Sequence, residues 1–509
     1  MQRRFLLSGP VLLVVLLAVL GVAKAGNTHE QDRSRGDTDL RLVLLVTVDQ
    51  FRYDYLTRFA DRYSSGLARL LREGAVFTNA HLEHYPTVTA PGHAALGSGA
   101  MPSTSGIIGN DWFDREAGKN VTSVSDEQVT QIGGAAAPSA SPHRLQVTTV
   151  ADELKLAARA RGATDLPRAV GVSLKDRSAI LPVGRSADAA FWYDSGTGEF
   201  VTSTYYASTL PDWVQKFNSH RLRDTYAGKP WPFLAAPDAQ RIAPAVPGKE
   251  LYAGIYGSPF GNELLTGFAI AALDGERLGQ REAIDVFSVS YSSNDSVGHT
   301  YGPDSPEVRA ITLQTDQTIG ELLAAVDRRV GLHRVLVVFT SDHGVAPLPE
   351  FLAERRLPGG RVAQEDIFGP IRTALEARFG AGQWILGTAG TSPYLNHALM
   401  RERGVDQVDA RQVAAAAARS IPRVTRVYTR EQLLQGSVPN DALGRRILQS
   451  YHLQRSGDLE IVLNPLWIRQ KSGTTHGTPY PYDAHIPLIF LGNGVRTGRY
   501  SQNVALNDV

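Results

Sequence analysis

Nearly continuous apolar runs rich in branched side chains recur along the chain, and each ends abruptly at polar residues. They cover residues 41–48, 284–292, 333–341 and 486–491, and another begins the segment 169–180. Such runs are typical of strands buried on both faces of a parallel sheet. Apolar positions at helical spacing mark residues 54–73, and a further helix is expected over 307–329. This alternation predicts an α/β fold with a doubly wound, mostly parallel central sheet.

Two stretches interrupt this alternation and predict insertions. Residues 191–206 form an aromatic-rich hairpin pattern, and 207–260, rich in Pro, Trp and Tyr, have no clear period. Residues 355–470 alternate helical stretches (369–379, 410–419) with short strands (424–428, 459–463). We therefore divide the chain into a catalytic α/β core over 39–354, with an inserted region around 181–270, a cap or second subdomain over 355–470, and a return to the core over 471–509.

The N-terminus has the three-part pattern of a secretory signal. Arg3 and Arg4 precede an apolar run from Phe5 to Val22, and Ala23-Lys24-Ala25 follows. We expect cleavage after Ala25, a polar linker over 26–38, and a periplasmic or secreted protein. The alternative is an uncleaved N-terminal membrane anchor, because the apolar run approaches the length that spans a bilayer.

The composition gives no sign of a nucleic-acid partner or of binding to a membrane surface. Fifty-two Lys and Arg stand against fifty-one Asp and Glu, so the net charge of +1 offers no general attraction to nucleic acid or to an anionic membrane. The chain has no cysteine, which excludes disulfides and thiolate ligands. A metal must therefore be held by histidines and carboxylates.

The segment YPTVTAPGHAALGSG, residues 85–99, predicts a loop that enters a helix close to Thr89. Proline suits the first helical turn, and the small residues allow close approach. A hydroxyl placed there lies beside unpaired backbone N–H groups that favour an anion such as phosphate. Taken alone, such a segment is more often an ordinary threonine near a helix start, so the rest of the chain must supply the context.

Five residues capable of binding metal follow three of the predicted strands. They are Asp49, Asp295, His299, Asp342 and His343. In a doubly wound sheet, ligands bind at the carboxyl ends of the strands, so we expect these side chains to gather at one edge. Asp295 and His299 are four residues apart and share a face if that segment is helical.

At this point the chain resembles the alkaline phosphatase superfamily, in the branch that holds nucleotide pyrophosphatases and PafA-type bacterial alkaline phosphatases. The matching segments, in the family's order, are VTVDQFR, YPTVTAPGHAAL with GIIGNDWFD, SLKDR, NDSVGH, SDHG and THGTPY. The resemblance implies two zinc ions, one held by Asp49, Asp342, His343 and the Thr89 oxygen and the other by Asp295, His299 and His476. His485 is a weaker competitor for His476. The resemblance also implies that Asn110, Lys175 and Arg177 hold the phosphoryl oxygens.

The resemblance and the residue types together predict a phosphatase acting through a covalent phospho-threonine. Two zincs can clamp an in-line displacement, and a hydroxyl held beside a Lewis acid implies a two-step route. Lys175 and Arg177 match the dianion of a phosphate monoester, whereas a diester carries an esterified oxygen there. We therefore expect small-molecule phosphate monoesters as substrates, no nucleic acid polymer as a partner, and a monomer.

Two alternatives remain open at this stage. One is a phosphodiesterase or nucleotide pyrophosphatase on the same scaffold, and the other is a non-catalytic phosphate or nucleotide binder. The resemblance also raises the expectation that the chain lacks a C-terminal helix, because it stops at Asn507-Asp508-Val509 where the family continues.

Overall fold

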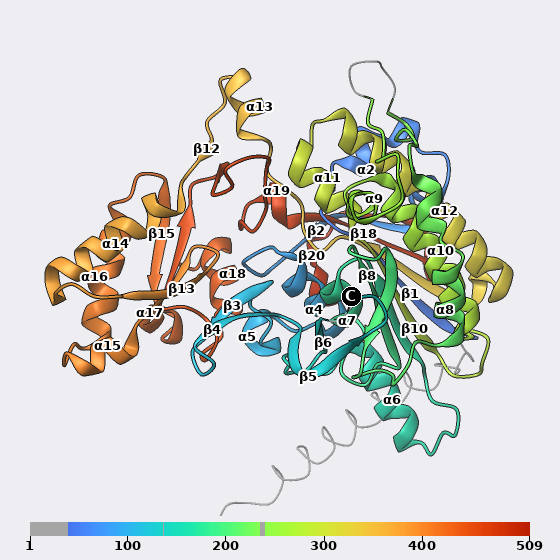
Figure 1. The fold of residues 1–509 in the computed structure, drawn as a ribbon, viewed down its shortest axis with the longest axis horizontal. Coiled ribbons are helices and arrows are strands. Elements are labelled where there is room, and N and C mark those ends of the chain that lie inside the picture. The colour runs from blue at the N-terminus through green and yellow to red at the C-terminus, as the bar shows by residue number, and fades with distance from the viewer. Residues whose placement is uncertain (1–38, 136, 235–239) are drawn as a thin grey trace, which may run out of the picture. The chain divides into compact units, whose positions relative to one another are not determined.

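A large sheet organises the chain, and its central strands run parallel (Figure 1). The computed structural model describes residues 39–135, 137–234 and 240–509. The parallel strands lie in the order β11 (Val335–Thr340), β1 (Leu42–Val48), β10 (Asp285–Tyr291), β7 (Ala169–Ser173) and β8 (Ala189–Asp194). Helices connect them, which confirms the predicted α/β class with a mostly parallel sheet.

Antiparallel pairings flank this parallel centre on both sides. The last apolar run forms β18 (His485–Gly492), which pairs antiparallel with β11 on one side and with β2 (Ala75–His81) on the other. The predicted hairpin is confirmed as β8 with β9 (Glu199–Ser203). The remaining strands of this sheet are β5 (Ser125–Ile132), β6 (Pro138–Ala140), β19 (Gly498–Tyr500) and β20 (Val504–Ala505).

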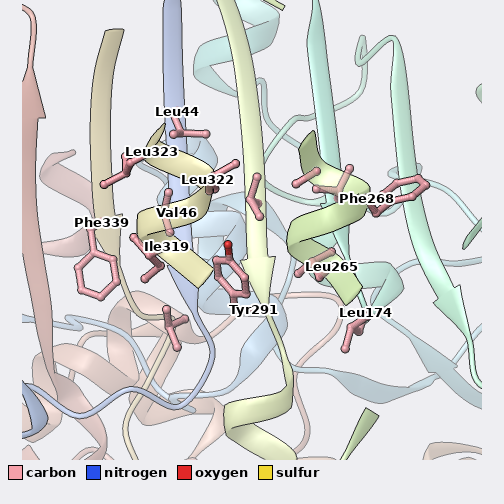
Figure 2. Packing of buried hydrophobic residues seen from close by; sticks show 14 of the residues in the cluster. Leu44, Val46, Leu174, Leu265, Phe268, Tyr291, Ile319, Leu322, Leu323 and Phe339 are labelled. Atoms are coloured by element: carbon pink, nitrogen blue, oxygen red, sulfur yellow. The ribbon is translucent and has the colours of Figure 1, made fainter. Parts of the chain in front are cut away.

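Side chains alternate across β1 because successive residues of a strand point to opposite faces. Leu44 and Val46 belong to the core that includes Phe268 of α10 (Pro259–Gly275) and Ile319 of α12 (Pro306–Arg329), as Figure 2 shows. Leu45 lies in a separate cluster on the other face. That face is covered by α4 (Thr89–Ser98), α6 (Val150–Ala160) and α7 (Asp176–Ile180).

The prediction of one helix over 54–73 is wrong. The segment forms α2 (Tyr55–Arg58), a 3₁₀ turn (Ala60–Arg62) and α3 (Gly66–Glu73). The carboxylate of Asp316 accepts hydrogen bonds from the backbone N–H groups of Ser64, Ser65 and Leu67 at 2.8, 2.9 and 2.7 Å. A carboxylate on a distant helix thus satisfies the donors at which α3 begins, a role no local pattern reveals.

Residues 355–470 contain a hydrophobic cluster of their own. There α14 (Gln364–Phe379) and α16 (Gln407–Arg419) pack with the antiparallel pair β15 (Val424–Thr429) and β16 (Leu459–Leu463). Both helices begin earlier than the sequence pattern predicts. The buried Asp458 joins this region to Arg115 of the core at 2.8 Å.

The other elements are short. The helices are α5 (Pro102–Ser105), α8 (Asp212–Ser219), α9 (Lys249–Tyr256), α11 (Ser293–Tyr301), α13 (Pro349–Glu354), α15 (His397–Glu402), α17 (Arg430–Leu434), α18 (Ala442–Ser450) and α19 (Pro481–Ala484), and the strands are β3 (Asp111–Asp114), β4 (Lys119–Thr122), β12 (Gly360–Arg361), β13 (Ile385–Ala389), β14 (Ser392–Leu395) and β17 (Trp467–Ile468). No helix in the described ranges is long and apolar enough to cross a bilayer. The predicted signal segment 1–25 and linker 26–38 lie outside those ranges.

Candidate functional site

The carboxyl ends of β1, β10 and β11 bring the predicted acidic and histidine residues together. Thr47 of β1 is in register with Ser290 of β10 and with Thr340 of β11, so the three strands end at the same level. Asp49 follows β1, Asp295 lies in the first turn of α11, and Asp342 follows β11. The edge predicted from the strand pattern is therefore where these side chains meet.

A first group capable of binding a metal consists of Asp49, Asp342 and His343, whose ligand atoms lie within 4.8 Å of one another. All three residues are buried. The hydroxyl oxygen of Thr89 lies 3.4 Å from His343 Nε2, so it adjoins this group. These are the four residues that the family resemblance assigns to one ion.

A second group lies next to the first. Asp295, His343 and His476 also have ligand atoms within 4.8 Å, which places His343 between the two groups. His299 Nε2 is 3.1 Å from Asp295 Oδ1, and His476 Nε2 is 3.5 Å from the same oxygen. The set expected for a second ion, Asp295, His299 and His476, thus converges on one carboxylate.

Backbone carbonyls orient all three histidines. The Nδ1 atoms lie at hydrogen-bonding distance from the carbonyl oxygens of Thr474 (His299, 2.7 Å), Gly344 (His343, 2.9 Å) and Thr87 (His476, 2.9 Å). An Nδ1–H donated to a carbonyl leaves Nε2 as the unprotonated ligand atom. Each Nε2 faces a carboxylate of the site, as metal-binding histidines do.

The charge balance of the site calls for cations. Asp49, Asp295 and Asp342 are all buried, and burial together with the charges of Asp295 and Asp342 raises the pKa of Asp49 well above its ordinary value. Asp49 Oδ1 and Asp342 Oδ2 accept no hydrogen bond from the residues that the structure describes. Carboxylate oxygens and neutral imidazoles are ligands that zinc accepts, so the residues present fit two such ions.

Thr89 is the first residue of α4, so its hydroxyl lies at the helix N-terminus. The helix approaches the metal-binding edge closely because Gly92 has no side chain. A Cβ at that position would lie 2.5 Å from the carbonyl oxygen of Asp342. The small residues of this segment therefore bring the hydroxyl beside the first group.

The three residues expected to hold phosphoryl oxygens lie around the same centre. Lys175 Nζ donates to Asp49 Oδ2 and to Asp295 Oδ2, each at 2.6 Å, and these charges outweigh burial to raise the pKa of Lys175. Asn110 Oδ1 accepts the N–H of Ala90 at 2.8 Å, next to Thr89. Burial opposes the charge of Arg177, but Asp176 and Tyr256, with smaller effects from Asp49 and Asp295, raise its pKa overall.

Sequence reasoning missed two further residues in contact with the site. His93 Nδ1 lies 2.9 Å from the Thr89 carbonyl oxygen and 3.3 Å from Asp342 Oδ2, and its Nε2 lies 2.8 Å from Ser290 Oγ. Gln50 donates its backbone N–H to Asp342 and its side-chain amide to Asp295. His93 is detectable as the residue four positions after Thr89, on the same helical face. His485 instead stacks on Tyr53, in neither ligand group.

A scan against family models matches residues 43–485 to the type I phosphodiesterase / nucleotide pyrophosphatase family. The chain is 33% identical to alkaline phosphatase PafA of Elizabethkingia meningoseptica, over 98% of this chain and 94% of that protein. Alkaline phosphatase PhoV of Synechococcus elongatus is 32% identical over the same shares. The crystal structure of PafA superposes with a TM-score of 0.83, covering 92% of this chain and 94% of that one.

Proposed function

The chain belongs to the type I phosphodiesterase / nucleotide pyrophosphatase family and is a hydrolase of phosphate esters, and within that family we propose that it is a two-zinc alkaline phosphatase. It acts on small phosphate monoesters through a phospho-threonine at Thr89. The observation that carries this proposal is the pairing of Lys175 with both Asp49 and Asp295, which fixes an ammonium group between the two ligand groups.

The contacts support a set of ligands for each ion. Asp49, Asp342 and His343, with the Thr89 oxygen, hold one ion, and Asp295, His299 and His476 hold the other. When bound, two such ions supply Lewis acidity to the attacking hydroxyl and to the leaving oxygen.

Thr89 is the nucleophile. Its Oγ1 loses a proton and forms a bond to phosphorus, while the bond from phosphorus to the ester oxygen breaks and the alcohol departs. A water then attacks the phospho-threonine, releasing inorganic phosphate and restoring the hydroxyl.

Lys175, Arg177 and Asn110 bind the non-bridging oxygens. An ammonium group has three N–H donors, and two of those on Lys175 serve Asp49 and Asp295, so the third can reach a phosphoryl oxygen. Arg177 Nε is buried and donates to no described residue. With its Oδ1 engaged by Ala90, Asn110 has its amide N–H₂ left to donate. Three donors and two positive charges match the dianion of a monoester.

A phosphodiesterase is the second candidate, because the matching family is that of type I phosphodiesterases and nucleotide pyrophosphatases. The test compares p-nitrophenyl phosphate with bis-p-nitrophenyl phosphate, using zinc-loaded wild type and the Lys175→Ala variant. We expect a strong monoester preference that Lys175→Ala erodes. A diester preference, or a preference that does not change in the variant, would replace this function with diester hydrolysis. Binding of phosphate without turnover of either ester would indicate the non-catalytic alternative.

We also propose export of the protein by the signal segment that ends near Ala25, and a monomeric state. N-terminal sequencing of the mature protein and light scattering test these two points separately.

A further inference from the structure

A cavity of about 360 Å³ opens beside the second ligand group. Of the seven predicted metal ligands, His299 and His476 line it, and Asn110 joins them. Thr89 is not among the lining residues and lies next to His343. In an in-line displacement the nucleophile and the leaving oxygen stand on opposite sides of phosphorus, so the released alcohol departs toward this cavity.

The far wall of the cavity comes from residues 389–470. Aromatic and aliphatic side chains such as Tyr394, Tyr451 and Val462 share this wall with serine hydroxyl groups, and Tyr85 and Ile108 belong to the lining from the core. Such a lining suits a leaving alcohol with a carbon skeleton or a ring.

Arg469 is the one arginine or lysine among the described residues that line this cavity. Its side chain is half-buried, and no hydrogen bond or ion pair joins its guanidinium to any residue in the described ranges. Burial lowers the pKa of Arg469. Tyr85 and Asp111 offset this effect of burial only in part. Nearby arginines differ, since Arg446 Nη1 donates to the Pro479 carbonyl at 2.6 Å and Arg411 Nε to Asp458 at 2.9 Å. A partly desolvated guanidinium without a hydrogen bond is costly, and an anion bound in the cavity removes that cost.

The carboxyl groups that line the cavity do not form an ion pair with Arg469. Asp111 is exposed, and Glu460 accepts a hydrogen bond from Ser392 Oγ at 3.1 Å. Burial raises the pKa of Glu460 to about 7, which leaves it partly neutral near that pH. Their presence favours a ligand with one negative charge over a ligand with two, because like charges repel across the cavity.

We propose that Arg469 binds a carboxylate on the alcohol side of the substrate, so that the preferred substrates are phosphate monoesters of alcohols or phenols that carry a carboxylate. This inference rests on the proposed phosphatase function and adds a substrate class to it. Guanidinium and carboxylate pair through two parallel hydrogen bonds, which makes the arginine selective for that group.

The test compares 3-carboxyphenyl phosphate with 3-carbamoylphenyl phosphate, which differ by one charge at the same ring position. The proteins are wild type, Arg469→Gln, Arg469→Lys and the control Arg401→Gln, which changes an exposed arginine of α15. We expect Arg469→Gln to lower kcat/KM for the carboxylate ester by about tenfold or more and to leave the amide ester within about twofold, the range for one charge-assisted pair. Arg469→Lys retains part of the effect and Arg401→Gln none.

A second measurement does not depend on turnover. Calorimetric titration with 3-hydroxybenzoate and with 3-hydroxybenzamide reports binding of the alcohol itself, and the benzoate should bind wild type more tightly than Arg469→Gln by a similar factor. Equal losses for both esters, or a carboxylate ester that is unaffected, would overturn the role of Arg469. If wild type hydrolyses neither ester, the phosphatase function itself fails, and a benzoate affinity that still depends on Arg469 would show the cavity's selectivity independently.

Discussion

The side-chain amide of Gln50 lies 2.6 Å from Asp295 Oδ1, and its backbone N–H lies 3.2 Å from Asp342 Oδ1, so one residue holds a carboxylate from each ligand group. Gln50 has a φ of 63°, a left-handed conformation unusual for a residue other than glycine. Its side-chain oxygen also lies where a Cβ on Gly298 would come within 1.8 Å. The turn that follows β1 thus holds Gln50 where it orients both Asp295 and Asp342.

Gln50→Gly should therefore separate folding from metal binding. Glycine adopts the left-handed conformation without strain, so we expect the melting temperature of the metal-free variant to stay close to that of wild type. Loss of the amide that orients Asp295 should weaken zinc binding or activity by about 10- to 100-fold, as for other supporting residues of metal sites. Competition with a chromophoric chelator measures the affinity. Unchanged zinc affinity and turnover would show that Gln50 does not position Asp295.

Replacement of the nucleophile should abolish turnover but not metal binding. In Thr89→Ala the carboxylates and histidines of both groups are intact, so we expect two bound zinc ions by elemental analysis and a loss of kcat of several orders of magnitude. Thr89→Ser restores a hydroxyl at the same helix N-terminus and serves as the matched control. The covalent intermediate can also be detected directly. Wild type and Thr89→Ser should form a phospho-protein, and Thr89→Ala should not. Wild-type rates in Thr89→Ala would remove Thr89 from the mechanism.

Metal removal should destabilise the protein as well as inactivate it. Without cations the buried charges of Asp49, Asp295 and Asp342 repel one another, with Lys175 as the counter-charge that pairs with Asp49 and Asp295. A ligand that binds the folded state alone stabilises it by about 2.7 kcal/mol at one hundred times its dissociation constant. We expect dialysis against EDTA to lower the melting temperature and zinc to restore it. A melting temperature that does not respond to zinc would contradict the assigned ligand sets.

The network around Asp458 should control the stability of residues 355–470. Asp458 Oδ1 lies 2.8 Å from His397 Nε2 and accepts from Arg411 at 2.9 Å, while Oδ2 accepts from Arg115 at 2.8 Å. We expect Asp458→Asn to lower the free energy of unfolding by about 3 kcal/mol, because it removes the buried counter-charge that Arg411 and Arg115 share and leaves Arg411 only Glu431. Chemical denaturation monitored by tryptophan fluorescence measures this loss, and the difference from a Trp384→Phe variant isolates the signal of the cluster that contains Trp384.

The same network predicts a pH dependence. Burial by itself would raise the pKa of Asp458, but the hydrogen bond from His397 and the charge of Arg115 lower it below the ordinary value. The stabilisation is therefore present above the pKa of an unfolded aspartate, about 3.9, and is lost as the pH falls toward the lower folded value. Asp458→Asn should flatten the acid limb of the stability curve below about pH 4. An unchanged acid limb would mean that other carboxylates determine it.

The sequence by itself determined the parallel centre of the sheet and the site that it carries. Buried strands appear as apolar runs, and β1, β10 and β11 are each followed closely by an aspartate that is a candidate metal ligand, so local pattern alone placed Asp49, Asp295 and Asp342 at one edge. The segment around Thr89 was recognisable because proline and small residues mark a closely packed helix start.

The tertiary structure decided what depends on contacts between distant segments. The strand β18 runs antiparallel to its neighbours β11 and β2. Its apolar sequence could not predict this, because a buried strand has the same apolar content in either direction. Asp316 interrupts the helix expected over 54–73 from 250 residues further along the chain, as its bonds to Ser64 and Ser65 show. Only the folded chain shows that Gln50 and His93 contact ligand residues. Only the folded chain shows that Arg469 lines the cavity without a hydrogen bond to the residues that the structure describes.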